Sequence, residues 1–375
     1  MDIILITGII LSFFQFILLL NKRRKDVSDK LLAMGMCTVG LHLLHYHLYH
    51  LGYWELYPNL IALTAPFPLF YGPVIYLYTQ YSFQTGTGLN KKDYLHFAPA
   101  VFSYLYMFKF YFFYSGKEKL MVINEEINDY SVFTSILLFA FIISGSVYTI
   151  LAYLKVNAHK RLVDNNFSYD EKISLNWLKY SIWGIGVVFL TTAAIVTLRD
   201  GLGIVFSFNA DFIFYTLIVI LIFCIGFFGI QHQNIFSNVN NPGQKELIQP
   251  PIPGEYRKSG LRQDVAELIH KKLIKLMSDE KPYLNPKLTL INLSEMMDVS
   301  TNHVSQIINQ YEKVNFHDFV NKYRVDEFIT RSKSNTNFSI LANALDSGFN
   351  SKSSFNIVFK KFKNITPSKF MDSLN

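Results

Sequence analysis

The chain has 375 residues, of which half are hydrophobic and 17% are charged, with a formal net charge of +7 and a mean hydropathy of +0.21. These values exclude a single soluble domain of ordinary composition, in which about 25% of the residues are charged. The two cysteines, Cys37 and Cys224, both lie in apolar runs, which excludes a disulfide framework and a cysteine-rich metal site.

Hydropathy divides the chain into two parts. Long apolar runs follow one another through residues 1–233, whereas the chain from Glu255 onward is charged and patterned like soluble helices. Between them, residues 234–260 are rich in Asn, Gly, Gln and Pro, which predicts a partly extended linker. We therefore expect a polytopic transmembrane domain, a linker and a soluble domain over residues 261–375.

Seven apolar runs are long enough to cross a hydrocarbon core about 30 Å thick at about 1.5 Å per residue. They are Ile3–Leu20, Leu31–Leu51, Leu60–Tyr81, Tyr94–Phe113, Val132–Leu154, Leu178–Leu198 and Ala210–Gly229. The third run contains Pro66, Pro68 and Pro73, so we expect it to be kinked. The predicted fold class is all-α, with a seven-helix transmembrane bundle followed by a soluble helical domain.

Basic residues predict the orientation of this bundle. The basic stretch Lys22–Lys25 follows the first apolar run and does not precede it, which favours a retained anchor over a cleaved signal. Lys91 and Lys92 sit in the third loop, and the fifth loop, residues 155–172, is also basic. The positive-inside rule then predicts an external N-terminus and a C-terminal domain in the cytoplasm.

Three histidines of the second run, His42, His45 and His50, lie on one broad helical face and are candidate residues for sensing zinc or a proton. No acidic residue lies within that run and the chain has no H-E-x-x-H motif. We favour the alternative, a polar face that makes hydrogen bonds between helices near the membrane surface. No metal and no cofactor are predicted.

The soluble part contains two copies of one helical pattern. In the first copy a short helix ends in a turn at Asp298, and Ser300 can cap the next helix. In the second copy Gly348 suits a left-handed turn position, and Ser351 can cap the helix that follows. A long helix, Phe316–Ser332, joins the copies. Two such units can present their second helices to major-groove faces about 34 Å apart on one side of a duplex.

Three runs near the C-terminus carry a family signature. They are Gly348-Phe349-Asn350-Ser351-Lys352-Ser353-Ser354-Phe355, then Phe359-Lys360-Lys361-Phe362, then Thr366-Pro367-Ser368. With them, the segment from Tyr283 to the C-terminus resembles the AraC-type DNA-binding domain. Upstream, residues 256–261 and the run around Gly72 and Pro73 resemble the membrane-anchored branch of these AraC/XylS-type regulators in Bacteroidetes-like bacteria. The resemblance implies a bacterial, non-enzymatic regulator of transcription that is multi-pass in the cytoplasmic (inner) membrane.

The resemblance also implies which residues contact DNA. Its base-reading positions, which periodicity places on the outer helix faces, fall on Asn302, Ser305, Gln306, Lys352, Ser353 and Asn356. Asn and Gln suit adenine, and Lys suits the acceptors of guanine. Phosphate contacts are expected from Lys360, Lys361 and Lys363, with Arg324 and Lys322 as further candidates. Ser294, Asn343 and Ile357 depart from the residues usual in the family.

The sequence thus predicts a membrane-embedded one-component transcription regulator that responds to a membrane or envelope signal. Its expected partners are double-stranded DNA and the lipid bilayer, with RNA polymerase and a second copy of the chain as further candidates. The sequence does not identify the signal ligand. The alternative is a transporter or other membrane protein with a regulatory C-terminal domain, but the apolar runs hold few ionisable residues. A third interpretation is that the transmembrane part is an inert anchor that only places DNA at the membrane.

Overall fold

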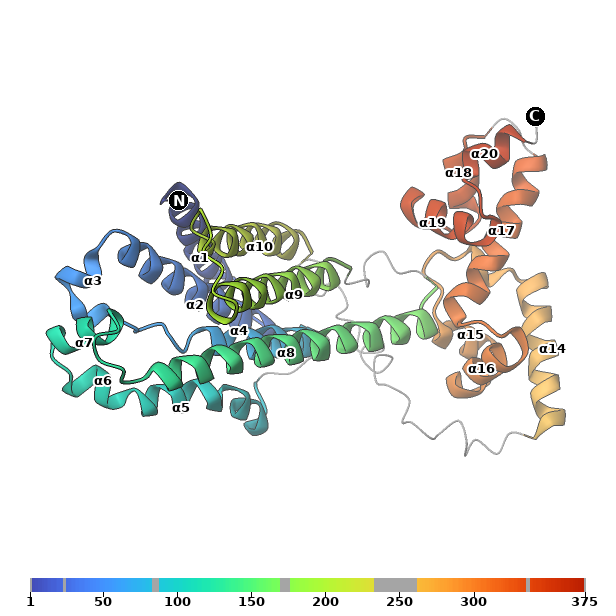
Figure 1. The fold of residues 1–375 in the computed structure, drawn as a ribbon. Coiled ribbons are helices and arrows are strands. Elements are labelled where there is room, and N and C mark those ends of the chain that lie inside the picture. Colours follow the sequence, from blue (N-terminus) through green and yellow to red (C-terminus); the bar gives the residue numbers. More distant parts are fainter. Residues whose placement is uncertain are drawn as a thin grey trace. The chain divides into compact units, whose positions relative to one another are not determined.

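The structure, a computed structural model, describes residues 2–22, 25–82, 88–168, 176–232, 262–334 and 338–373. Within these ranges the chain is helical, and its one β-type pairing is an isolated antiparallel bridge between Phe167 and Thr289. The chain divides into two compact units (Figure 1). Unit 1 comprises residues 1–157 and 175–233, and unit 2 comprises residues 158–174 and 234–375. The expected linker, residues 234–260, lies outside the described residues.

Unit 1 is a set of packed helices. In chain order they are α1 Asp2–Asn21, α2 Val27–His50, α3 Tyr53–Leu56, α4 Pro68–Ser82, α5 Ala98–Tyr106, α6 Phe108–Phe113, α7 Gly116–Ile123, α8 Ser131–Asn166, α9 Asn176–Val196 and α10 Asp211–His232. Helix α2 packs on α1 and on α4, and α10 packs on α1 and α9. The last residues of α8, from Ala158, belong to unit 2.

Four helical stretches among the described residues are long and apolar enough to cross a membrane. They are α1, α2, α8 and Trp177–Arg199, which contains most of α9. A shorter apolar stretch, Asp211–Phe227, lies in α10. The structure therefore does not show the seven-helix transmembrane bundle that hydropathy predicts.

Two of the seven predicted spans are wrong as continuous helices. The run Leu60–Tyr81 forms turns up to Phe67, and α4 begins only at Pro68, because a proline cannot donate a helical hydrogen bond and disfavours helix in the residue before it. The run Tyr94–Phe113 starts in a 3-10 helix and then breaks at Met107 between α5 and α6. Hydropathy alone does not detect such breaks.

Small residues allow the helices of unit 1 to approach closely. A Cβ atom added to Gly145 of α8 would meet the ring of Phe189 on α9 at 2.1 Å, and one added to Gly226 of α10 would meet the side chain of Gln15 on α1 at 2.1 Å. The buried Gln15 amide donates to the carbonyl oxygen of Ile222, 2.9 Å away. Close backbones and a satisfied polar group are typical of helices that pack in an apolar medium.

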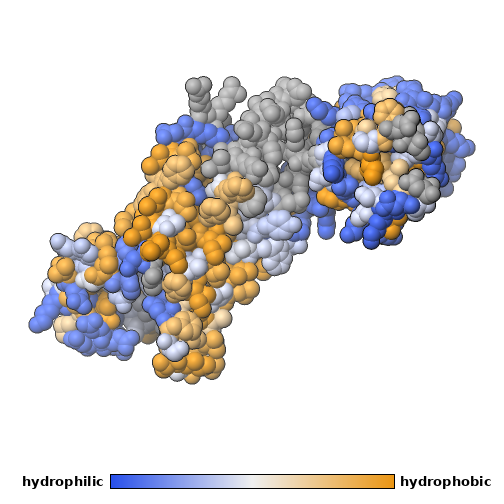
Figure 2. Space-filling model, turned by 90° about the horizontal axis from the view of Figure 1, so that it is seen from above, coloured by the Kyte–Doolittle hydropathy of each residue, from blue (hydrophilic) through white to orange (hydrophobic). Residues whose placement is uncertain are grey.

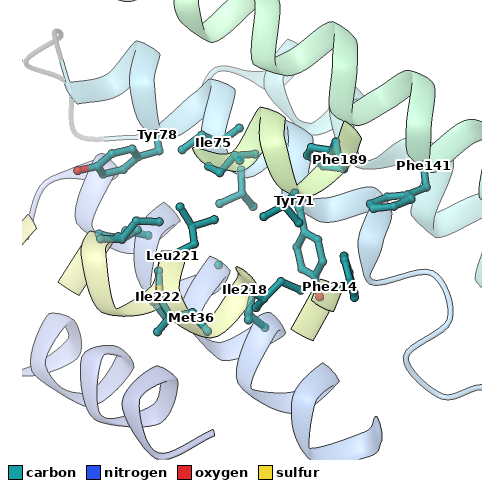
Figure 3. Close-up of a pocket in the computed structure, with 17 residues that line it drawn as sticks. Met36, Tyr71, Ile75, Tyr78, Phe141, Phe189, Phe214, Ile218, Leu221 and Ile222 are labelled. Carbon is teal, nitrogen blue, oxygen red and sulfur yellow. The ribbon is translucent and has the colours of Figure 1, made fainter. Parts of the chain in front are cut away.

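An apolar cavity of about 110 Å³ lies among α2, α4, α8, α9 and α10 (Figure 3). Met36, Ile75 and Phe141 are among the side chains that line it. The ring of Tyr71 also lines it, and the Tyr71 hydroxyl is hydrogen-bonded to Nδ1 of His42 at 2.6 Å. Because its wall is almost entirely carbon, the cavity suits a small apolar group and not a polar one.

Apolar side chains cover much of the outer surface of unit 1. Along α8 they recur every three or four residues, which places them on one face, and all of them are exposed: Val132, Ile136, Phe139, Ile143, Val147, Ile150 and Leu154. Figure 2 shows that apolar residues gather over this unit, whereas hydrophilic residues dominate the visible face of unit 2. Each large apolar side chain forgoes about 1.5–3 kcal/mol when it stays in water. This surface favours an apolar surrounding.

Unit 2 has two apolar cores that share one helix. Its C-terminal helices are α14 Gln263–Asp279, α15 Leu290–Met297, α16 Thr301–Ile307, α17 Phe316–Ser334, α18 Ile340–Asp346, α19 Lys352–Lys363 and α20 Pro367–Asp372. Helix α17 gives Phe319 and Val320 to the core that contains α14, α15 and α16. It gives Val325 and Phe328 to the core that contains α18 and α19. In Figure 1, α17 runs from the first pair of helices to the second.

Candidate nucleic-acid interface

The first helix-turn-helix unit consists of α15 and α16. Thr289 caps α15, since its hydroxyl accepts from the backbone N–H of Asn292 at 3.2 Å. The turn between the helices contains Asp298 in the left-handed region at φ +52°. Ser300 then caps α16, and its hydroxyl accepts from the N–H of His303 at 3.3 Å. Both the turn and the cap lie where the sequence predicts them.

The second unit, α18 and α19, repeats this arrangement with a glycine in the turn. Gly348 has φ +93°, and a Cβ atom there would lie 2.2 Å from the carbonyl oxygen of Tyr283, so no side chain fits. Ser351 caps α19 by accepting from the N–H of Ser354 at 3.2 Å. Asn364 ends α19 in the left-handed region at φ +60°.

On α16 the structure separates the three predicted base-reading residues. Asn302 is exposed and Gln306 is half-buried. Ser305 is buried, and its hydroxyl accepts from the Nδ2 amide of Asn309 at 3.5 Å. The prediction that Ser305 reads a base is therefore wrong for this conformation, because Ser305 lies beside Val304 on the inward side of the helix.

On α19 the predicted base-reading residues share one exposed face. Lys352, Ser353 and Asn356 are all exposed, while Phe355 and Val358 face the core. Ile357, which departs from the residue usual in the family, lies on the same outer face and is 68% exposed. An apolar side chain in that place can contact the methyl group of thymine. The helix thus offers two polar side chains, a cation and one apolar side chain to a groove.

The three lysines at the end of α19 differ in their partners. Lys361 pairs with both carboxylate oxygens of Asp318 on α17, at 2.6 and 2.7 Å, and Lys363 lies 3.4 Å from a carboxylate oxygen of Asp326. The contacts of His317 and Lys361 hold the pKa of Asp318 below its ordinary value. Lys360 is exposed and has no ion-pair partner within the part of the chain that the structure describes. Lys360 is therefore the best placed of the three to contact a phosphate.

Arg324 is not placed to contact phosphate, contrary to the prediction. It lies on the inner side of α17 with 1% of its surface exposed. Its guanidinium donates to the carbonyl oxygens of Tyr283, Asn285 and Ser168 at 2.7–2.9 Å. A guanidinium held on all sides by buried acceptors cannot reach a nucleic acid. The other candidate on this helix, Lys322, is exposed.

The three histidines of α2 have separate partners. His42 bonds to Tyr71, and His45 bonds to the carbonyl oxygen of Leu60 at 2.7 Å. His50 lies 3.8 Å from a carboxylate oxygen of Asp2. The described residues contain no group of three or more His, Cys, Asp or Glu side chains that could hold a metal ion. These contacts fit the interhelical hydrogen-bonding alternative, and a sensing role for the histidines stays a prediction.

The comparison with protein families agrees with this geometry. Residues 293–373 match a family described as a helix-turn-helix domain. The match begins at Leu293 in α15 and ends at Ser373 after α20, so it takes in most of both units. Comparison of the chain with curated proteins and with solved structures found no match. Residues 293–373 are a helix-turn-helix domain of the AraC type, whose partner is DNA.

Proposed function

We propose that the chain is a membrane-embedded one-component transcription regulator, which binds promoter DNA sequence-specifically while its N-terminal helices lie in a bilayer. The observation that carries this proposal is the pair of capped helices, α16 and α19, which are joined by α17 and whose outer faces carry mainly polar side chains. A single helix with a polar outer face normally only exposes that face to water and binds nothing. Two in a tandem helix-turn-helix arrangement are suited to two major-groove contacts.

Some side chains on these faces are suited to contacts with base edges, and others to contacts with phosphate. Asn302, Gln306 and Asn356 carry amides, which can make paired hydrogen bonds with adenine, and Lys352 can reach the acceptors of guanine. Lys360 would anchor the complex to phosphate and give it a salt-dependent affinity. The soluble segment from Glu255 has an excess of about five positive charges, which favours this contact.

Unit 1 supports the membrane part of the proposal. Four helical stretches have the length and hydropathy of membrane spans, and the exposed apolar face of α8 would be costly in water. In this proposal the cytoplasm contains unit 2. A membrane or envelope signal acts through changes in how the helices of unit 1 pack. An apolar signal molecule would bind in the cavity beside Tyr71, because the lining of that cavity is apolar.

The test is DNA selection with the full-length protein in lipid nanodiscs, followed by footprinting of the selected sites. We expect two protected half-sites about one helical turn, or roughly 34 Å, apart. The double variant Asn302→Ala/Asn356→Ala should lose the protected pattern. Lys275→Ala, which removes an exposed lysine of α14 outside the matched domain, should keep it. If the wild-type protein protects no site even at low salt, the proposal is wrong.

The bilayer part needs its own measurement. Cysteine accessibility in whole cells, with single cysteines at Lys92 and Lys275, should place both positions in the cytoplasm. An exposed cysteine at Glu126, in the loop before α8, should face the opposite side. Labelling of Lys275→Cys from outside intact cells would contradict the proposed topology.

A further inference from the structure

Two residues that directly follow α8 are buried in unit 2. Phe167 is 3% exposed and Ser168 is 1% exposed. Phe167 pairs with Thr289 in the antiparallel bridge, at the beginning of α15. The backbone N–H and the hydroxyl of Ser168 both donate to the carbonyl oxygen of Leu288, at 3.3 and 2.7 Å. This short segment therefore pairs with the strand-like stretch that enters the first helix-turn-helix unit.

Two side chains of α17 hold the other side of Ser168. The Arg324 guanidinium donates through Nη1 to the Ser168 carbonyl oxygen at 2.9 Å and through Nη2 to its hydroxyl at 3.0 Å. The Nδ2 amide of Asn321 also donates to that carbonyl oxygen, at 3.2 Å. Burial lowers the pKa of Arg324 to about 9. A buried guanidinium needs acceptors for its donors, and Ser168 supplies two of them.

These contacts lie where the two helix-turn-helix units meet. We call this place the joint; it is formed by Arg324, Tyr283, Asn285 and Gly348. Arg324 also donates to the carbonyl oxygens of Tyr283 and Asn285, which precede the first unit. Gly348, the turn residue of the second unit, lies against the same place, since a Cβ atom on it would be 2.2 Å from the Tyr283 oxygen and 3.1 Å from Nε of Arg324. One guanidinium thus touches the entry to the first unit, the turn of the second unit and Ser168.

We propose that the Phe167–Ser168 segment is an internal ligand of the DNA-binding domain, and that its docking at the joint fixes the orientation of α16 relative to α19. The segment is joined without interruption to α8, which has the length and hydropathy of a membrane span. Withdrawal of Ser168 removes two acceptors from the buried Arg324, so water must enter the joint or the joint must rearrange. Movement of α8 is thereby linked to the spacing of the two recognition helices.

A cysteine pair tests the docking itself. Phe167 and Thr289 are opposite each other in an antiparallel pair without mutual hydrogen bonds, where Cα atoms are about 4.5 Å apart and a disulfide can form. In full-length protein in membranes, with Cys37 and Cys224 replaced by serine, we expect Phe167→Cys/Thr289→Cys to cross-link on mild oxidation. The control pair, Phe167→Cys with the exposed Lys275→Cys, should not. Equal cross-linking of both pairs, or of neither, would overturn the docking.

Because a double substitution can disturb folding, a single substitution of nearly the same size provides a second test of the docking. Ser168→Cys should react with a hydrophilic maleimide at least tenfold more slowly in the native protein than Lys275→Cys, and equally fast after denaturation. If the two cysteines react at the same rate in the native protein, Ser168 is not docked.

The role at the joint has a separate readout. Ser168→Pro removes the backbone donor and the hydroxyl, and we expect it to lower the preference for a two-half-site duplex over a single half-site by about tenfold. Affinity for the single half-site should not change. An unchanged preference overturns the role at the joint even if the cross-link forms. This part rests on the proposed DNA binding, whereas the cross-link and the labelling do not, so their failures are distinguishable.

Discussion

The two helix-turn-helix units use the same pattern with different chemistry. In the first unit, α16 has seven residues, carries no lysine or arginine, and exposes amide side chains such as Asn302. In the second unit, α19 has twelve residues and four lysines, of which Lys361 and Lys363 are paired with carboxylates of α17. Under the proposed function, the first unit reads base edges, while the second combines base reading with contacts to phosphate.

The cores of the two units differ as well. The first core is built mainly from Leu, Ile, Val and Met side chains of α14, α15 and α16. The second core is smaller and depends on a cluster of rings, in which Phe328, Phe349 and Phe359 each lie 4.6–5.6 Å from Phe355, centroid to centroid. An aromatic pair contributes about 0.5–1.5 kcal/mol beyond the area that it buries. A small core that rests on one central ring tolerates its loss poorly.

The largest expected effect is therefore the loss of Phe355. Phe355→Ala should reduce the free energy of opening of α19 by about 3–5 kcal/mol, because it removes a buried ring and leaves a cavity. Amide hydrogen exchange of the full-length protein should show much faster exchange in α19 and a far smaller change in α16. Equal acceleration in both helices would show that the two cores are not separate.

The two turns provide the next comparison. Gly348→Ala should destabilise the second unit by about 2–3 kcal/mol, because alanine is strained at φ +93° and its Cβ would collide with the Tyr283 carbonyl oxygen. Asp298→Gly in the first turn should change stability by less than about 1 kcal/mol, since glycine adopts φ +52° without strain. Hydrogen exchange of α18 and α15 measures both effects, and similar values would contradict the stated geometry.

The two units should also differ in how their side chains contribute to DNA-binding affinity. Asn302→Ala should weaken DNA binding by about 1–3 kcal/mol and relax the base preference at one position of the site. Lys360→Ala should weaken binding to all sequences alike and reduce the salt dependence by about one counterion. Lys361→Ala should have a smaller effect on the salt slope than Lys360→Ala, because Asp318 already pairs with Lys361. A larger effect at Lys361 would mean that this ion pair opens on DNA.

The smallest expected effect belongs to the pairing of α19 with α17. The depressed pKa of Asp318 means that its carboxylate stabilises the fold above its unfolded pKa of about 4, and that this contribution is lost as the pH falls through the lower, folded pKa. Asp318→Asn should therefore be less stable than wild type near pH 7, by less than about 1 kcal/mol. The difference should shrink below about pH 4 in unfolding measurements at matched ionic strength.

Local patterns in the C-terminal domain could be predicted from the sequence because their causes are local. Caps at Ser300 and Ser351 and the left-handed Gly348 depend on a few neighbouring residues. The prolines predicted a kink in the run Leu60–Tyr81, but the start of α4 only at Pro68 and the break at Met107 were not predicted, because hydropathy averages over them. Arg324 was misassigned because its partners include Ser168, which lies 156 residues away along the chain. A cation is normally exposed, and only tertiary contacts show this one to be internal.

Helix α17 belongs to both cores of the DNA-binding domain, and this affects how the domain is degraded. Because it gives Val320 to one core and Val325 to the other, its backbone can unfold only when apolar surface is lost on both sides. Proteases need unfolded chain, so a cut within α17 would report collapse of the whole DNA-binding domain, whereas the outer helices can fray and close again. Quality control in the cell would therefore remove this domain as a whole, and would rarely leave half of it attached to the rest of the chain.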